Sequence, residues 1–121
     1  MADITEITTG SLIPAEKVID SSVYNLEGDK LGSIEDIIID KVSGRSIYAI
    51  MSFGGFLGMG HKHYPLPWSV LDYSKEKGGY VVNIDKELLK NAPGYDDEVE
   101  WTPKYGRNVD TYYNAPTYWN E

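Results

Sequence analysis

Short runs of β-branched residues alternate with glycine-containing turns along the first half of the chain, and this alternation limits the fold more than any other feature. The run over residues 31–40 holds four isoleucines, and it is too β-branched and too uninterrupted for an amphipathic helix. The segments 27–30 and 41–45 contain glycine beside polar residues, as tight hairpin turns do. We therefore predict two successive antiparallel hairpins from extended segments at 18–26, 31–40 and 46–53, with the middle segment buried on both faces.

The second half of the β region contains turn formers at regular intervals. Further strands are predicted at residues 61–68, 70–73 and 80–84. Pro65 and Pro67 remove backbone donors, so the first of these strands is expected at a sheet edge. Asp85 is a suitable N-cap for one short helix over residues 86–91. The sequence therefore predicts a small all-β domain of about six short antiparallel strands with one short helix.

Composition divides the chain into a flexible lead-in at residues 1–11, the β domain at 12–91, and an acidic C-terminal arm at 92–121. The arm carries more large aromatic residues than a disordered acidic tail normally would, and its prolines favour an extended path. It either covers an apolar edge of its own chain or reaches a second chain. We predict that it and the apolar glycine-rich loop at 54–60 form a homodimer or partner interface. The predicted interface residues are Phe56, Leu57, Met59, Trp101, Tyr105, Tyr112, Tyr113, Tyr118 and Trp119.

Charge and cysteine content exclude several functions. The net charge of −8 comes without any Lys/Arg cluster, which argues against nucleic acid and against an anionic membrane surface. No apolar run approaches the ~20 residues of a bilayer span and no secretory signal pattern opens the sequence, so direct membrane insertion is not expected. The absence of cysteine excludes disulfides and thiol chemistry and fits the cytoplasm.

Candidate chemical motifs are sparse. Residues 55–62 resemble a phosphate-binding loop, but the required Lys position holds His61, so no nucleotide cofactor is predicted. His61 and His63 alternate on one predicted strand and offer two metal ligands, yet no third ligand is fixed nearby. Asp36 and Asp40 share a strand face and are expected to end the strand and accept turn hydrogen bonds. We therefore predict no catalytic residues and no cofactor.

Two segments resemble the PRC-barrel family, which includes the cytoplasmic part of the photosynthetic reaction-centre H subunit and the C-terminal domain of the ribosome-maturation factor RimM. The first is VYNLEGDKLGSIEDIIID at 23–40, and the second runs from FGGFLGMG to PLPW at 53–68. The family signature falls on Gly28, Gly32, Asp36 and Asp40. The resemblance implies a small β-barrel that serves as a protein-binding or assembly module, with no catalytic residues to carry over.

The function expected from this resemblance is that of a non-catalytic cytoplasmic adaptor, associated with a photosynthetic or electron-transport complex or with another protein partner, and forming a homodimer. The first alternative is a metal- or small-ligand-binding protein or enzyme centred on His61 and His63. A third is a role in ribosome assembly, as in RimM. The residues do not identify the physiological partner, because a docking surface has no invariant chemistry.

Overall fold

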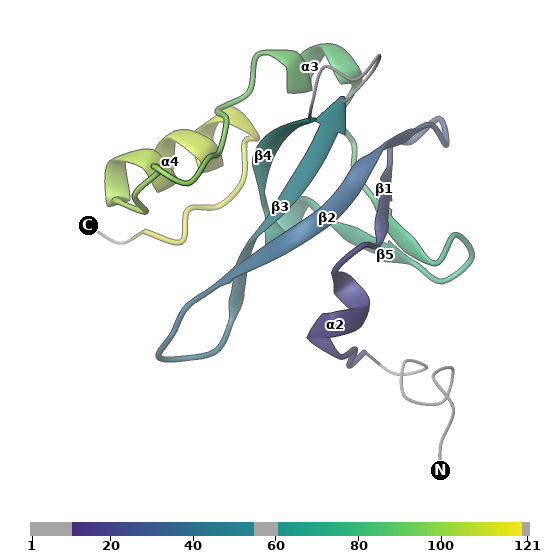
Figure 1. The fold of residues 1–121 in the computed structure, drawn as a ribbon, viewed down its shortest axis with the longest axis horizontal. Coiled ribbons are helices and arrows are strands. Elements are labelled where there is room, and N and C mark those ends of the chain that lie inside the picture. The colour runs from purple at the N-terminus through teal and green to yellow at the C-terminus, as the bar shows by residue number, and fades with distance from the viewer. Residues whose placement is uncertain (1–10, 55–60, 120–121) are drawn as a thin grey trace.

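The predicted strands assemble into one sheet in the computed structural model, which describes residues 11–54 and 61–119 (Figure 1). The strands are β1 (Ser22–Tyr24), β2 (Lys30–Ile39), β3 (Ser46–Gly54), β4 (His61–Pro67), β5 (Asp72–Ser74) and β6 (Gly79–Val81). Their order across the sheet is β4-β3-β2-β1-β6-β5. The number of strands and the edge position of the proline-containing strand β4 are as predicted.

The sheet differs from the expected antiparallel barrel in two respects. Strands β1 to β4 form an antiparallel meander, but β1 pairs with β6 in parallel, with Val23 opposite Tyr80 and Tyr24 opposite Val81. The six-stranded sheet is mixed and is not closed into a barrel. The parallel pair follows from the connectivity, because the chain crosses β2, β3 and β4 before β6 returns beside β1, and neighbours joined by such a crossover can run in the same direction.

Two glycines allow the central hairpin to form. Gly44 has φ +81° in the turn between β2 and β3, where its amide donates to the Asp40 carbonyl at 2.7 Å. Gly32 lies opposite Phe53 where β2 and β3 cross closely, and a Cβ atom on it would be 1.7 Å from the Ser52 carbonyl oxygen. The family-signature glycine at position 32 is therefore required by the close approach of the two backbones.

The single helix predicted at residues 86–91 is present, but the described residues also form helices that were not predicted. The described residues contain α2 (Ala15–Val18), a 3₁₀ turn η2 (Trp68–Val70), α3 (Lys86–Lys90) and α4 (Pro103–Tyr112). Helix α3 begins as predicted, since the Asp85 carboxylate accepts the Leu88 amide at 2.8 Å. Helix α4 overturns the expectation of an extended C-terminal arm: the Thr102 hydroxyl caps it by accepting the Tyr105 amide at 3.2 Å, and Pro103 begins the first turn.

The prediction that β2 is buried on both faces is wrong, and it is β3 that is buried along most of its length. Residues 47–52 of β3 are all buried, whereas Ile37 and Ile38 of β2 are half-buried and Ile39 is 54% exposed. The reason is the C-terminal arm, which covers the outer face of β3 and β4 with α4 (Figure 1). Buried side chains from α3 and α4, Leu89 and Val109, join the strand residues in one core cluster.

Candidate protein-binding site

The C-terminal arm is attached to the sheet of its own chain through Tyr48 of β3. The Tyr48 ring stacks on Trp101 with 4.5 Å between centroids. Its hydroxyl donates to Asp110 Oδ1 at 2.9 Å and accepts from Trp119 Nε1 at 2.8 Å. Desolvation is the main cause that raises the pKa of Tyr48 well above its usual value of 10, and the hydrogen bond to Asp110 acts in the same direction. Tyr48 therefore stays protonated and able to donate.

Three tyrosines of the arm are also held within their own chain. Tyr105 and Tyr112 donate hydrogen bonds of 2.6 Å to the carbonyls of Gly94 and Leu88. Burial raises the pKa of Tyr105 to about 12. Tyr113 is 8% exposed, and its hydroxyl has no hydrogen-bond partner among the residues that the structure describes. The six aromatic residues of the arm that were predicted as part of an interface thus make intrachain contacts, which is one of the two alternatives for the arm; contact with a second chain stays a prediction.

The signature residue Asp40 connects the arm to the β2–β3 hairpin. Its Oδ1 accepts the amides of Val42 and Ser43 at 2.9 Å each, and its Oδ2 accepts a hydrogen bond from the Tyr118 hydroxyl. The hydrogen bond from Tyr118, followed by those from the two amides, lowers the pKa of Asp40 from 3.8 to about 2. Its carboxylate is thus held by the turn on one side and by the arm on the other.

Asp36, the other acidic signature residue, lies inside β2 and does not end it. Its Oδ1 accepts the amide of its neighbour Ile37 at 2.8 Å, next to a β-bulge between Ile34 and Asp36. Gly28 has φ +92° in the β1–β2 turn. The four signature residues therefore support hairpin geometry and are not brought together as one chemical site.

An apolar hollow lies between the β2–β3 hairpin and the C-terminal arm, and we call it the hairpin surface. It has a volume of about 560 Å³ and is lined by Ile38, Ile39, Asp40, Lys41, Val42, Ile47, Tyr48, Trp101, Tyr118 and Trp119. Val42 is 92% exposed at the turn, and Ile39 is 54% exposed beside it. Three of the predicted interface aromatics, Trp101, Tyr118 and Trp119, thus lie next to exposed aliphatic side chains that sequence reasoning did not select.

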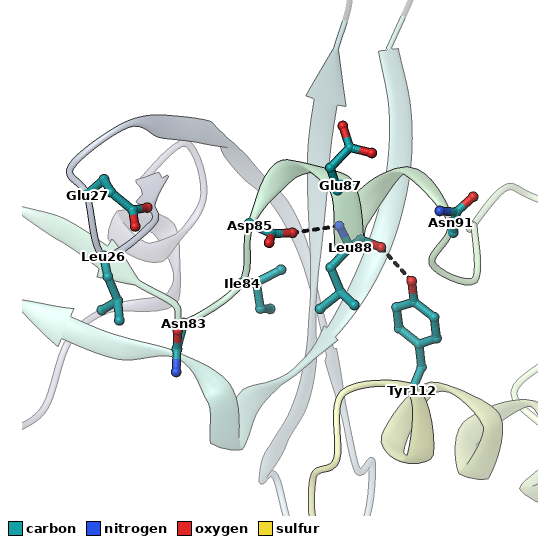
Figure 2. Close-up of a pocket in the computed structure, with 9 residues that line it drawn as sticks. All are labelled: Leu26, Glu27, Asn83, Ile84, Asp85, Glu87, Leu88, Asn91 and Tyr112. Carbon is teal, nitrogen blue, oxygen red and sulfur yellow. Dashed lines mark hydrogen bonds between the residues drawn. The ribbon is translucent and has the colours of Figure 1, made fainter.

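A second cleft, which we call the α3 cleft, lies on helix α3 (Figure 2). It measures about 540 Å³ and is lined by Leu26, Glu27, Asn83, Ile84, Asp85, Glu87, Leu88, Asn91 and Tyr112. The hydroxyl of Tyr112, which extends from α4, donates to the Leu88 carbonyl and so anchors α3 to α4. The sequence signal that was missed is Leu26, an aliphatic residue in an otherwise polar turn that is 64% exposed.

The histidine alternative gains little from the described part of the chain. His63 Nε2 lies 3.8 Å from Glu35 Oε1 across the sheet. Within residues 11–54 and 61–119, no group of three His, Cys, Asp or Glu side chains is placed to hold a metal ion. The side chain of His61 and the predicted interface residues Phe56, Leu57 and Met59 lie outside what the structure describes.

The fold and these surfaces define a small mixed β-sheet module with exposed apolar and acidic hollows. None of the helices in the described ranges has the length and hydropathy needed to cross a bilayer. The PRC-barrel domain family matches residues 11–89, and the chain belongs to this family, which confirms the resemblance seen in the sequence. The chain is also 23% identical over 77 residues to an uncharacterized protein of Deinococcus radiodurans; the match covers 64% of this chain but only 27% of that relative.

Proposed function

We propose that this protein is a non-catalytic protein-binding module of the cytoplasm that self-associates and carries a further protein partner. Membership of the PRC-barrel family supports a module-level role. The observation that carries the proposal is the hairpin surface, where Ile39 and Val42 are exposed. They lie beside the half-buried rings of Trp101, Tyr118 and Trp119. Exposed aliphatic residues that adjoin aromatic ones are typical of interface centres, which bury apolar side chains and exclude water.

The side chains with reactive chemistry near this surface support the same proposal. Asp40 is committed to the turn amides and Tyr118, and Asp110 to Tyr48 and the Tyr118 amide. These carboxylates and the Tyr48 hydroxyl hold the arm on the sheet, and a group engaged in this way is a poor candidate for acid or base catalysis. What the hairpin surface offers a partner is apolar area.

The experiment is capture of partner proteins by wild-type protein and by the double variant Ile39→Glu/Val42→Glu. Both positions are solvent-accessible, so two carboxylates there should leave folding intact but oppose docking of an apolar partner. We expect the double variant to lose the captured partner. Leu12→Glu is the matched control, because Leu12 is 80% exposed and lies in the N-terminal segment, away from the hairpin.

Thermal unfolding of the three proteins shows whether each variant is folded. Loss of capture in the folded hairpin variant alone would support the hairpin surface as the docking site. Equal capture by wild type, hairpin variant and control would contradict it.

A further inference from the structure

The tip of the β2–β3 hairpin is positively charged on an otherwise acidic protein. Lys41 and Arg45 are exposed on either side of Val42. The one carboxylate in the turn, Asp40, is directed to the amides of the turn itself and to Tyr118. The hairpin therefore presents an aliphatic side chain between two cations, although the whole chain carries a net charge of −8.

The α3 cleft has the complementary composition. Three carboxylates line it, from Glu27, Asp85 and Glu87, and none of the described residues in its lining is Lys or Arg. Leu26 is 64% exposed and Leu88 38% exposed within the same cleft. Glu87 also pairs with Lys90 at 3.2 Å, but both side chains are exposed, so this pair contributes little and leaves Glu87 available.

The β2–β3 hairpin and helix α3, whose residues line the cleft, lie at opposite ends of the molecule (Figure 1). Strand β2 begins directly after the turn that holds Leu26 and Glu27 and ends at the hairpin. Its ten residues separate the two sites by about 33 Å, at ~3.3 Å of rise per residue. A hairpin therefore cannot reach the cleft of its own chain, but it can reach the cleft of a second copy.

We propose that the protein self-associates head to tail, with the hairpin tip of one copy seated in the α3 cleft of the next. Val42 lies against Leu26 and Leu88, and the cations Lys41 and Arg45 face the cleft carboxylates. This inference rests on the self-association in the proposed function, since it names the hairpin tip and the α3 cleft as the two surfaces that meet.

A contact between two different surfaces is heterologous, and it generates a ring if the rotation closes or an open chain if it does not. An open chain grows beyond a dimer as protein concentration rises, whereas a ring stops at a fixed number of copies. Either assembly should weaken as salt is added, because its ion pairs lie at an exposed interface. A closed two-fold dimer made by two hairpins would show neither continued growth nor dependence on the cleft.

The test is a charge exchange followed by sedimentation velocity. The hairpin variant is Lys41→Glu/Arg45→Glu, and the cleft variant is Glu27→Lys/Glu87→Lys; Asp85 is kept because it caps α3. Each variant alone places like charges opposite each other, so association should weaken at least ~100-fold. An equimolar mixture of the two variants restores opposite charges across the contact and should associate again.

Two control variants carry the same changes of net charge elsewhere. Lys62→Glu/Lys104→Glu matches the hairpin variant, and Glu16→Lys/Glu98→Lys matches the cleft variant; all four side chains are exposed. Both controls should associate like the wild type. Association that survives in the cleft variant but not in the hairpin variant would replace this proposal with a hairpin-to-hairpin dimer.

A wild type that stays monomeric, or a mixture that fails to restore association, would overturn the head-to-tail contact. A monomeric wild type would also remove self-association from the proposed function, whereas the binding of a further protein partner is tested separately, by loss of a captured partner in Ile39→Glu/Val42→Glu. Conversely, head-to-tail assembly without any hairpin-dependent partner would leave the inference standing and limit the function to self-assembly.

Discussion

The Tyr48 hydroxyl lies 2.9 Å from Asp110 Oδ1, and this contact joins the central strand β3 to helix α4 across 62 positions of sequence. Both residues are buried, with exposed fractions of 1% and 2%. Trp119 Nε1 donates to the same hydroxyl, so three segments of the chain meet at one oxygen atom. A buried carboxylate is costly without donors, so the Tyr48 hydroxyl, which donates to Asp110, helps to hold the arm on the sheet.

We predict that Tyr48→Phe destabilises the protein by about 2 kcal/mol, since it leaves Asp110 with one donor fewer and Trp119 Nε1 without an acceptor. The free energy of unfolding from urea titration, followed by tryptophan fluorescence, measures the effect. Tyr73→Phe is the matched control, because Tyr73 is 48% exposed and its hydroxyl can exchange any hydrogen bond for one to water. Equal stability of the two variants would show that the Tyr48 hydroxyl does not anchor the arm.

Because the Tyr118 hydroxyl donates a hydrogen bond to Asp40, we predict that acid weakens the attachment of the arm to the hairpin. The pKa of Asp40 is lowered from 3.8 to about 2 in the folded protein. A lowered pKa stabilises the fold above the unfolded value, and this contribution is lost as pH falls from about 4 to about 2. In Tyr118→Phe the pKa of Asp40 should move back toward 3.8 but not reach it, because the amides of Val42 and Ser43 remain.

Carboxyl resonances followed by NMR across this pH range give the pKa of Asp40 directly. The variant should also lose less stability than the wild type on acidification. Tyr73→Phe serves as the control, because it removes an exposed tyrosine hydroxyl and keeps that of Tyr118. An unchanged pKa of Asp40 in Tyr118→Phe would mean that the turn amides alone account for the shift.

Gly106 is a second point at which the arm depends on close contact. A Cβ atom at this position would lie 1.9 Å from Trp119 Nε1. Alanine normally favours a helix interior over glycine by about 1 kcal/mol. We nevertheless predict that Gly106→Ala destabilises the protein or displaces Trp119, seen as a shifted indole resonance and greater acrylamide quenching. Asn108→Ala, exposed in the same helix, should stabilise α4 and leave Trp119 in place.

The strands of the β region could be predicted from the sequence because the signals for them are local. Alternating side chains and glycine turns fix the meander of β1 to β4, and Asp85 caps α3 as its position indicates. The parallel pairing of β1 with β6 brings together residues more than fifty positions apart, for which no local signal exists. The burial of β3 on both faces could not be read from that strand, because its second cover comes from the arm.

The sequence of the arm contains a helix-start pattern from which α4 could have been predicted. Thr102 followed by Pro103 is a typical helix start, with a capping hydroxyl and a proline at the first position. Glycine and β-branched residues within 103–112 hid the helix, since Gly106, Val109 and Thr111 all lower helix propensity. Tertiary contacts to Tyr48 and Trp101 compensate for that low propensity. The two hollows, in contrast, depend on how the arm and α3 lie on the sheet, which the sequence pattern does not contain.

Removing the hydroxyl of Tyr113 is expected to change stability in the opposite direction to removing that of Tyr48. It is 8% exposed, and burial raises its pKa well above the usual value, yet its hydroxyl finds no partner among the described residues. Removing a buried hydroxyl that makes no hydrogen bond relieves its desolvation cost. Tyr113→Phe should therefore be neutral or stabilising by up to ~1 kcal/mol, whereas Tyr48→Phe destabilises. Urea titration of both variants in parallel decides the point: a loss of stability in Tyr113→Phe comparable to that in Tyr48→Phe would show that the Tyr113 hydroxyl is hydrogen-bonded in solution.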